Sequence, residues 1–450
     1  MESTSAPADS AVAPAAAIRP ALPALPRLEA RRRALIANAM LGGMVVAAFL
    51  MAAGAAAKHY GPTLHIHHGL PDSLRGPLHG LNISLSGTEF GVVFILLGLC
   101  YLGVLAFADS VKVRFGVGAI VLLHLIFVIA PPLLSSDIFN YVGYARLDAV
   151  HGLNPYVHPL SAAPTDPSYI YVGWPLNTTA YGPLFTLGSL PLGWISFPAA
   201  IWVLKSVTAL ASLGCVALVW ACAVRLGRSP LPAALFFGLN PVLLAYAVGG
   251  AHNDLLMLAA ALGGIYLLLG GRESGMAALV GAVAVKSSAV VLLPFALLGS
   301  RRPGRALIWG GLAAVVVGAI TVIAFGTHVS SLLHVLQRDA RLETPNDVPG
   351  VINDVLGLGL ANRTLGRIGM LVLIVAVAAL LVRVYRGGDW LENAGWATCA
   401  VIVTTTWFLP WYLIWFLPLA ALALRPYQRL TALALTALAI GLQLPLIFGK

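Results

Sequence analysis

The sequence predicts an all-α polytopic membrane protein with about 11–13 transmembrane helices. Hydrophobic residues make up 59% of the 450-residue chain, and charged residues only 10%. The hydrophobic residues are gathered in uncharged runs of about twenty, the length at which a helix crosses the hydrocarbon core of a bilayer. A soluble core cannot use so much apolar surface, so the composition excludes a soluble enzyme or binding domain.

Neither the net charge nor the cysteine content narrows the class of membrane protein further. The formal net charge of +10 would indicate nucleic-acid binding in a soluble protein. Here arginines on the cytoplasmic side of a membrane explain the charge, and no nucleic-acid partner is expected. The four cysteines all lie within apolar runs, so the sequence indicates neither a disulfide framework nor a zinc site.

The first 33 residues are rich in Ala and Pro, lack aromatic residues and end in Arg31-Arg32-Arg33. They predict a disordered cytoplasmic tail, followed by a transmembrane domain over residues 34–450. The expected spans are approximately 34–57, 91–108, 116–134, 196–223, 230–249, 253–270, 306–325, 366–384, 393–409, 411–424 and 429–448. The three long loops, about 58–90, 135–195 and 326–365, all fall on the outer side, where we expect them to cover the helices as a cap.

The segment 276–299 is long enough to cross the membrane, yet it has arginines at both ends. Arg272 precedes it, and Arg301, Arg302 and Arg305 follow it. Because basic residues collect on the cytoplasmic side, this pattern predicts a re-entrant hairpin or broken helix with Lys286-Ser287-Ser288 near its tip. A full span would also weaken the asymmetry of Lys and Arg between the two sides.

The stretch from Ser135 to Tyr156 follows an apolar run that ends in Pro131-Pro132. Its first ionisable residue is Asp137, and Asp137, Tyr141, Tyr144 and Asp148 recur at three- and four-residue spacing. One short helix would therefore carry them on one side, and Gly152 to Tyr156 would end it. A carboxylate at the membrane edge beside aromatic residues suits chemistry on a lipid-delivered substrate. Asp137 could equally cap the helix that follows it.

A second polar group, His252-Asn253-Asp254, follows Gly249-Gly250 at the outer end of a span. Ionisable residues at membrane depth are rare and usually functional. Helix capping by Asn253 or Asp254 is the alternative, but three consecutive polar residues exceed what a cap requires, so we favour a functional role.

Two lysines lie inside apolar segments. An isolated ammonium group in lipid costs on the order of 3 kcal/mol, so Lys205 and Lys286 each require an anionic partner or a wet cavity. The phosphate of a lipid would be such an anionic partner. Alternatively, Lys205 extends its charge to the surface along its own alkyl chain.

Other motifs carry weaker signals. His59, His65, His67, His68 and His79 lie in a Gly- and Pro-rich loop and fit no recognised zinc spacing, so we expect no structural metal there. The aromatic segments Tyr171–Phe185 and Trp407–Tyr412 suit either the membrane interface or stacking on a sugar ring. The mixed charges between Arg338 and Asp347 indicate a solvated loop, in which one arginine could hold a phosphate.

Together these motifs resemble the GT-C superfamily of polytopic glycosyltransferases, and more narrowly its actinobacterial members that take mannose from polyprenyl-phosphate mannose. The resemblance covers nearly the whole chain after the tail. The motifs that carry it are SSDIFNY (135–141), GLNPY (152–156), YGPLF (181–185), NPVLL with HND (240–254), AVAVKSSAVVLLP (282–294) and LPWYLIW (409–415).

The resemblance implies transfer of mannose to a lipid-linked mannan, forming an α-(1→6) linkage with inversion at the outer face of the bacterial plasma membrane. It implies Asp137 as catalytic base, although the first carboxylate of such enzymes often follows the first span and this one follows the third. Asp148 and Asp254 therefore stay open as bases, and Glu89 is a weaker candidate. No cofactor is expected beyond the donor, and dependence on a divalent metal stays open. The residues expected to bind substrate are Tyr141, Asn154, Tyr181, Lys205, His252, Asn253, Asp254 and Lys286.

Other functions are also compatible with the sequence. A lipid or sugar transporter commonly shows internal repeats and broken helices near the midplane, but here only the segment 276–299 fits, and no repeat is visible. A non-catalytic scaffold would not explain a carboxylate at one face with lysines in the bundle. Within the enzyme class, another polyprenyl-phosphate sugar or another acceptor is equally compatible with the residues.

Overall fold

The structure is a computed structural model that describes residues 27–57, 69–339, 342, 344 and 347–441. Most of the expected tail, and the histidines at positions 59, 65, 67 and 68, lie outside these residues. Residues 27–33 are described, and the prediction of disorder is wrong for them because they form the first turns of α1 (Arg27–Ala57). Arg, Leu, Glu and Ala are good helix formers, and Glu29 pairs with Arg33 one turn later at 3.8 Å.

The described residues form helices and turns, with no strand among them. The longer helices after α1 are α3 (Gly87–Ala106), α4 (Val113–Ile129), α5 (Asp137–Ala149), α7 (Phe197–Arg225), α9 (Asp254–Leu269), α10 (Gly275–Val285), α12 (Pro303–Phe325), α15 (Asn362–Tyr385), α16 (Trp390–Thr404) and α18 (Pro426–Gly441). Shorter elements are α2 (Asp72–Arg75), α6 (Pro183–Ser189), α8 (Pro230–Gly238), α11 (Leu292–Gly299), α13 (Ser331–Asp339), α14 (Val348–Val355) and α17 (Leu417–Ala421).

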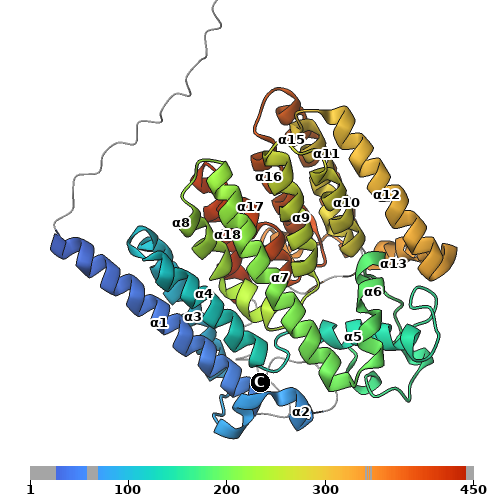
Figure 1. The fold of residues 1–450 in the computed structure, drawn as a ribbon, viewed down its shortest axis with the longest axis horizontal. Helices are drawn as coiled ribbons and strands as arrows, with labels where there is room; N and C mark the ends of the chain where they lie inside the picture. Colours follow the sequence, from blue (N-terminus) through green and yellow to red (C-terminus); the bar gives the residue numbers. More distant parts are fainter. Residues whose placement is uncertain (1–26, 58–68, 340–341, 343, 345–346, 442–450) are drawn as a thin grey trace, which may run out of the picture.

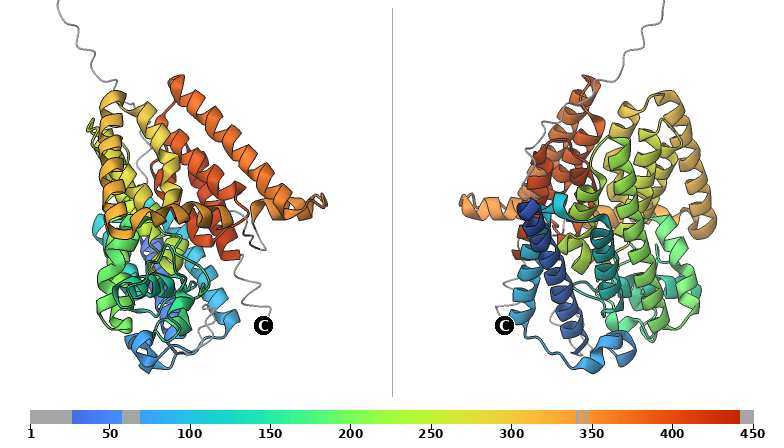
Figure 2. Two further views of the ribbon diagram at one scale, coloured as in Figure 1. Left: turned by 90° about the vertical axis from the view of Figure 1, so that its right-hand side faces the viewer. Right: turned by 60° about the vertical axis from the view of Figure 1, so that its left-hand side comes forward.

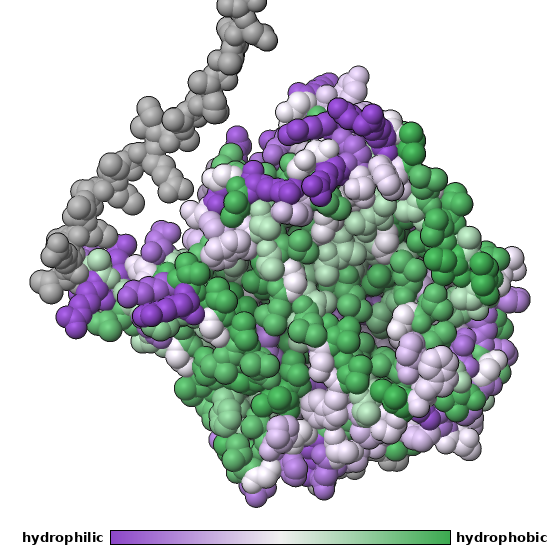
Figure 3. All heavy atoms as spheres, viewed as in Figure 1, coloured by the Kyte–Doolittle hydropathy of each residue, from purple (hydrophilic) through white to green (hydrophobic). Residues whose placement is uncertain are grey.

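Among the described residues, five helices are long and apolar enough to cross a membrane: α1, α3, α7, α12 and α15. Four shorter apolar helices accompany them, Val113–Ile129, Asp254–Leu269, Gly275–Val285 and Ser287–Gly299. On the face shown in Figure 3, hydrophobic side chains cover the middle, and hydrophilic ones gather along the upper and left edges and at the lower right. These features confirm an all-α polytopic membrane protein.

Two expected spans are interrupted rather than continuous. The segment 230–249 divides into α8 and a π-helix, η6 (Leu243–Val248), on either side of Asn240-Pro241. Pro241 has no amide hydrogen to donate, and the Asn240 side chain accepts hydrogen bonds from the amides of Val242 and Leu243. The segment 411–424 is likewise a 3₁₀ helix, η9 (Pro410–Trp415), followed by α17.

One end of the helix bundle is rich in arginine, and we call it the arginine-rich end. Arg225 at the end of α7 donates to the Tyr266 carbonyl near the end of α9, and Gln428 of α18 donates to the Glu392 carbonyl of α16. Arg228, Arg272, Arg301, Arg302, Arg305, Arg383, Arg386, Arg425 and Arg429 lie at the neighbouring helix ends. We call the opposite end the site end. It holds the first residues of α7 and α9 and the end of α12.

The segment 276–299 forms the predicted hairpin. At its base, the Glu273 carboxylate accepts hydrogen bonds from Ser300 Oγ at 2.6 Å and from the amide of Arg302 at 3.0 Å, so its two ends meet. At its tip, Lys286 is extended and breaks the helix between α10 and the 3₁₀ turn η7 (Ser287–Val291). The hairpin therefore rises from the arginine-rich end and returns to it.

The loop 135–195 folds into a layer beyond the helix bundle, and we call this layer the cap. It contains α5 and α6, which lie at the lower right of Figure 1, and both further views show them at the same end of the molecule (Figure 2). The cap has its own hydrophobic core, which joins α5 to Leu70, Leu74 and the first turns of α7. The cap thus holds α5 against the ends of the membrane helices.

Thiol labelling tests the hairpin. Single cysteines introduced by Arg272→Cys and Arg301→Cys, in a background without the native cysteines, should react with an impermeant reagent from one and the same side of the membrane. Leu176→Cys should react from the other side, since its side chain is exposed on the cap. Labelling of the two arginine positions from opposite sides would mean that the segment crosses the membrane.

Candidate active site

Asp137 begins α5 at the site end, just after α4 has ended. Leu134 has a positive φ of 59°, and the Ser135 hydroxyl accepts a hydrogen bond from the Asp137 amide at 3.2 Å, which fixes the turn into α5. The Asp137 side chain is 17% exposed, and its carboxylate oxygen lies 3.7 Å from Nδ1 of His252. A hydrogen bond from the Trp174 side chain also reaches the carboxylate. Its contacts therefore extend beyond its own helix, to the cap and to the start of α9.

The segment that carries His252, Asn253 and Asp254 is pressed against the end of α4. A Cβ added at Gly250 would lie 2.5 Å from the Tyr246 carbonyl oxygen and 2.9 Å from that of Leu133, so this approach requires glycine. The next residue, Ala251, has a positive φ of 54°. This tight turn brings all three polar side chains into the protein, where each is completely buried.

Asp254 and Lys286 form a buried ion pair between the start of α9 and the tip of the hairpin. Lys286 Nζ lies 2.7 Å from both carboxylate oxygens, and Trp415 Nε1 of η9 donates to Oδ1 at 2.5 Å. Asp254 is completely buried, whereas the Lys286 side chain is 16% exposed. Because both carboxylate oxygens have donors, the pair satisfies the buried charge of Asp254.

Aromatic rings from η9 enclose the pair. The His252 ring stacks on Trp411 with centroids 4.1 Å apart, and Tyr412 stacks on Trp415 at 4.3 Å. Lys286 Nζ lies 5.5 Å from the ring centroids of both Tyr412 and Trp415. Trp415 is not among the residues that the sequence predicts to bind substrate; the sequence indicates its segment only through the motif LPWYLIW.

Tyr141 connects the cap to the buried polar group. Its hydroxyl donates to Asn253 Oδ1 at 3.3 Å, and its ring meets the edge of Tyr181 at 4.7 Å between centroids. Tyr141 is 1% exposed, whereas Tyr181 is partly exposed. Asp137 and Tyr141 lie one turn apart on α5, and Tyr181, just before α6, packs against Tyr141. The three side chains are therefore brought together.

Three buried polar atoms in this group have no hydrogen-bond partner within the described part of the chain. They are Nδ1 and Nε2 of His252 and Nδ2 of Asn253. Buried polar groups are nearly always hydrogen-bonded, to protein, to ordered water or to a ligand. The arrangement therefore has hydrogen-bonding capacity beyond what the protein itself uses.

The electrostatic surroundings of Asp137 favour a base. Burial raises the pKa of its carboxyl to about 6, and the Asp254 charge adds to the rise. The Lys286 charge and the hydrogen bond from Trp174 act in the opposite direction. A carboxyl with this pKa is mostly ionised at neutral pH and is a stronger proton acceptor than an ordinary aspartate.

Two residues predicted to bind substrate have structural partners instead. Lys205 is completely buried in α7, and its Nζ donates to the carbonyls of Gly249 at 2.7 Å and Pro131 at 3.5 Å, where α4 and η6 have ended. The Asn154 amide donates to the Phe325 carbonyl at 2.8 Å and accepts from the Tyr156 amide at 3.0 Å. Each satisfies main-chain groups left free at a helix end or turn, so neither prediction of a substrate contact is supported.

The alternative bases lie in less suitable places. Asp148 is eleven residues beyond Asp137 on α5, which at 1.5 Å per residue is about 16 Å away. Asp254 is fully engaged by Lys286 and Trp415. Glu89 forms a capping box with Ser86 at the start of α3. The geometry therefore favours Asp137 over all three.

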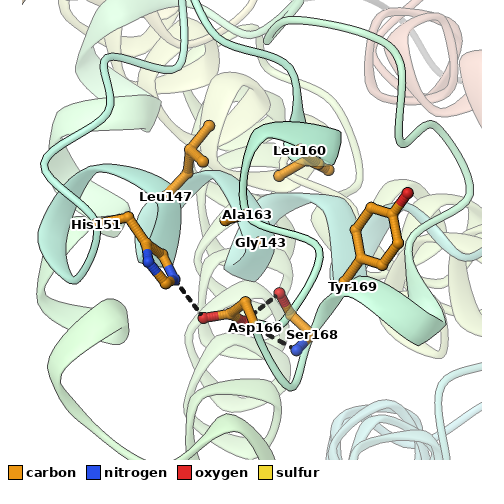
Figure 4. Close-up of a pocket in the computed structure, with 8 residues that line it drawn as sticks. All are labelled: Gly143, Leu147, His151, Leu160, Ala163, Asp166, Ser168 and Tyr169. Atoms are coloured by element: carbon orange, nitrogen blue, oxygen red, sulfur yellow. Dashed lines mark hydrogen bonds and ion pairs between the residues drawn. The ribbon is translucent and has the colours of Figure 1, made fainter.

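A small pocket in the cap lies beside α5 and has a structural explanation (Figure 4). Its carboxylate, Asp166, accepts hydrogen bonds from Arg146 and His151 at 2.9 Å and from the Ser168 hydroxyl at 2.7 Å. These hydrogen bonds hold the pKa of Asp166 well below its usual range. All of its oxygens are used within the cap, so this pocket stabilises the layer that carries Asp137.

The described residues contain no group of three or more His, Cys, Asp or Glu side chains arranged to hold a metal ion.

The Lys286–Asp254 pair can be tested through stability. Lys286→Met should lower the free energy of unfolding by about 3 kcal/mol because it leaves the buried Asp254 charge uncompensated. Adding Asp254→Asn should recover most of that loss, since the amide oxygen still accepts from Trp415. Lys112→Met, at an exposed lysine, is the matched control. Equal thermal unfolding of Lys286→Met and this control would contradict the pairing.

Residues 39–301, more than half of the chain, match the family described as "Alpha-(1->6)-mannopyranosyltransferase, N-terminal domain", and residues 346–446 match the "MptB C-terminal domain". No solved structure matches the chain.

Among curated relatives, alpha-(1->6)-mannopyranosyltransferase A of Mycobacterium tuberculosis is 30% identical over 67% of this chain and 64% of its own length. A probable alpha-(1->6)-mannopyranosyltransferase of Mycolicibacterium smegmatis is 28% identical over 79% of this chain and 73% of its own length. The match thus spans somewhat less than two thirds of the first relative. Since the family match over residues 39–301 alone covers more than half of the sequence, this chain belongs to the alpha-(1->6)-mannopyranosyltransferase family.

Proposed function

We propose that this protein transfers mannose from polyprenyl-phosphate mannose to a lipid-linked mannan, forming an α-(1→6) linkage with inversion. Family membership and the names of the relatives support the sugar and the linkage. The single observation that supports the chemistry is the Asp137 carboxylate, partly exposed at the site end, with a pKa raised to about 6.

In this proposal Asp137 is the general base. A mannosyl phosphate carries its own good leaving group, so the reaction requires no general acid. Asp137 takes the proton from the acceptor hydroxyl as that oxygen attacks the anomeric carbon, and the bond to the phosphate oxygen breaks on the opposite side. One displacement on a β-linked donor gives an α-linked product, with the proton on Asp137 and the charge on the released polyprenyl phosphate.

Lys286 is the residue we assign to the donor phosphate. Its ammonium is close enough to lower the pKa of Asp137, and its side chain is partly exposed, so it can face both the buried Asp254 and an arriving phosphate. A cation near the departing phosphate stabilises the charge that develops there. Three neighbouring residues are completely buried: His252, Asn253 and Asp254. We therefore assign them to holding Lys286 and Asp137 in place rather than to direct contact with the mannose of the donor.

Orientation follows from the distribution of basic residues. Lys and Arg are enriched on the cytoplasmic side of bacterial membrane proteins, so we assign the arginine-rich end and the start of α1 to the cytoplasm. The site end and the cap then face outward. Mannose would be transferred at the outer face of the plasma membrane, where a polyprenyl-phosphate sugar and a lipid-linked glycan share one leaflet.

Replacing Asp137 tests the base. In membranes supplied with radiolabelled polyprenyl-phosphate mannose and a short α-(1→6) oligomannoside, Asp137→Asn should lower the transfer rate by about 10³-fold, since general base catalysis contributes typically 10²–10⁴-fold. Asp148→Asn is the matched control, because it makes the same change on the same helix. Transfer at the wild-type rate by Asp137→Asn would move the base elsewhere.

The pH profile tests the same residue without a substitution. A base must be deprotonated to act, so kcat/KM should rise with pH and level off above about 6, the pKa of Asp137. The Lys286 charge lowers this pKa, so Lys286→Met should move the acid limb to higher pH. An acid limb near 4, unchanged in Lys286→Met, would indicate an ordinary exposed carboxylate as the base.

A further inference from the structure

A second cavity, of about 360 Å³, lies between α14, the start of α15 and the segment that carries Thr406. This volume falls within the range of ligand pockets, which is about 300–1,000 Å³. Six of its eight lining residues have polar side chains. These six residues are Thr344, Asp347, Asn353, Asp354, Asn362 and Thr406.

The chemistry of this lining fits a neutral polyol. Carboxylate oxygens accept hydrogen bonds, amide groups both donate and accept, and hydroxyl groups do either. A sugar presents hydroxyls that need both kinds of partner. The Asp354 carboxylate would repel a phosphate, so the cavity suits the sugar of an acceptor and not the phosphate of a donor.

The cavity is connected to Asp137 through a short series of contacts. The Thr344 amide donates to the Thr406 carbonyl at 2.9 Å, and the Thr344 hydroxyl accepts from the Phe408 amide at 3.0 Å. Between these residues lies Trp407, whose ring meets the edge of Trp174 at 6.0 Å between centroids. Trp174 in turn donates to Asp137. The segment that lines the cavity at Thr406 therefore also contacts, through Trp407, the side chain that donates to Asp137.

The position of α14 places the cavity at the membrane surface. In Figure 2, α14 extends sideways from the body at the foot of α15, which is one of the long apolar helices. Its face toward the cavity carries Gly350, Asn353 and Asp354. Its other face carries Val351, Ile352 and Val355, which are 41%, 49% and 78% exposed. A helix that is apolar on its outer face, beside the start of a span, fits the interface between lipid and water.

We propose that this cavity binds sugar units of the lipid-linked oligosaccharide acceptor. The bound units lie one or more sugar units away from the one whose hydroxyl attacks. The proposal rests on the function proposed above and extends it to a specific acceptor subsite. Acceptors too short to reach from Asp137 to the cavity gain nothing from it, whereas longer ones bind more tightly. The cavity therefore makes the enzyme prefer longer acceptors.

The test compares two acceptor lengths in the full-length protein. Asp354→Ala removes a hydroxyl partner, and Asp354→Trp fills the cavity. Both should raise the KM for an α-(1→6)-linked tetramannoside about tenfold, and leave the donor KM and the KM for a dimannoside nearly unchanged. Asp109→Ala, at an exposed aspartate near the arginine-rich end, is the control. An unchanged tetramannoside KM, or a raised donor KM, in both Asp354 variants would overturn the proposal.

A binding measurement separates this inference from the proposed function. If the wild type transfers no mannose, the proposed function fails, and binding of the tetramannoside to the wild type and to Asp354→Ala, followed by saturation-transfer NMR, decides the inference alone. Binding that weakens in Asp354→Ala and is equal in Asp109→Ala supports the cavity. No binding, or equal binding in all three proteins, overturns it.

Discussion

The buried ion pair between Asp254 and Lys286 is the interaction on which the rest of the site depends. It joins the start of α9 to the tip of a hairpin that comes from the opposite end of the bundle, and Trp415 attaches η9 to the same carboxylate. Removing either partner would leave the other charge uncompensated and destabilise the fold. Once paired, the two residues hold these three segments together beside Asp137, and they place a cation and an anion where both influence its protonation.

The site separates into a buried part and an exposed part. His252, Asn253 and Asp254 are completely buried, whereas Asp137, Lys286 and Tyr181 reach the surface to some extent. This separation suits a transferase, in our account, because a base must meet an arriving hydroxyl while its neighbours stay fixed. The cap contributes to the same end: the Arg146–Asp166 pair stabilises the layer that holds α5, and α5 carries Asp137, the base in our proposal.

Part of this arrangement could be predicted from the sequence, and the reason differs from residue to residue. Arginines on both sides of 276–299 predicted the hairpin because the positive-inside rule acts on local sequence. The spacing from Asp137 to Asp148 predicted α5 because helical periodicity is also local. The partners of Lys205 and Asn154 could not be predicted, since they are carbonyl groups freed by breaks in distant helices, at Gly249 and Phe325. The same holds for Trp415, whose contact with Asp254 joins residues far apart in the chain.

The most direct measurement is an experimental structure of the full-length protein with a non-transferable analogue of polyprenyl-phosphate mannose and a tetramannoside acceptor. Our account predicts the attacking hydroxyl within about 2.6–3.2 Å of the Asp137 carboxylate, the reach of a general base. It also predicts the donor phosphate beside Lys286. An acceptor hydroxyl bound next to Asp148, or a phosphate on the far side of the bundle, would contradict the account.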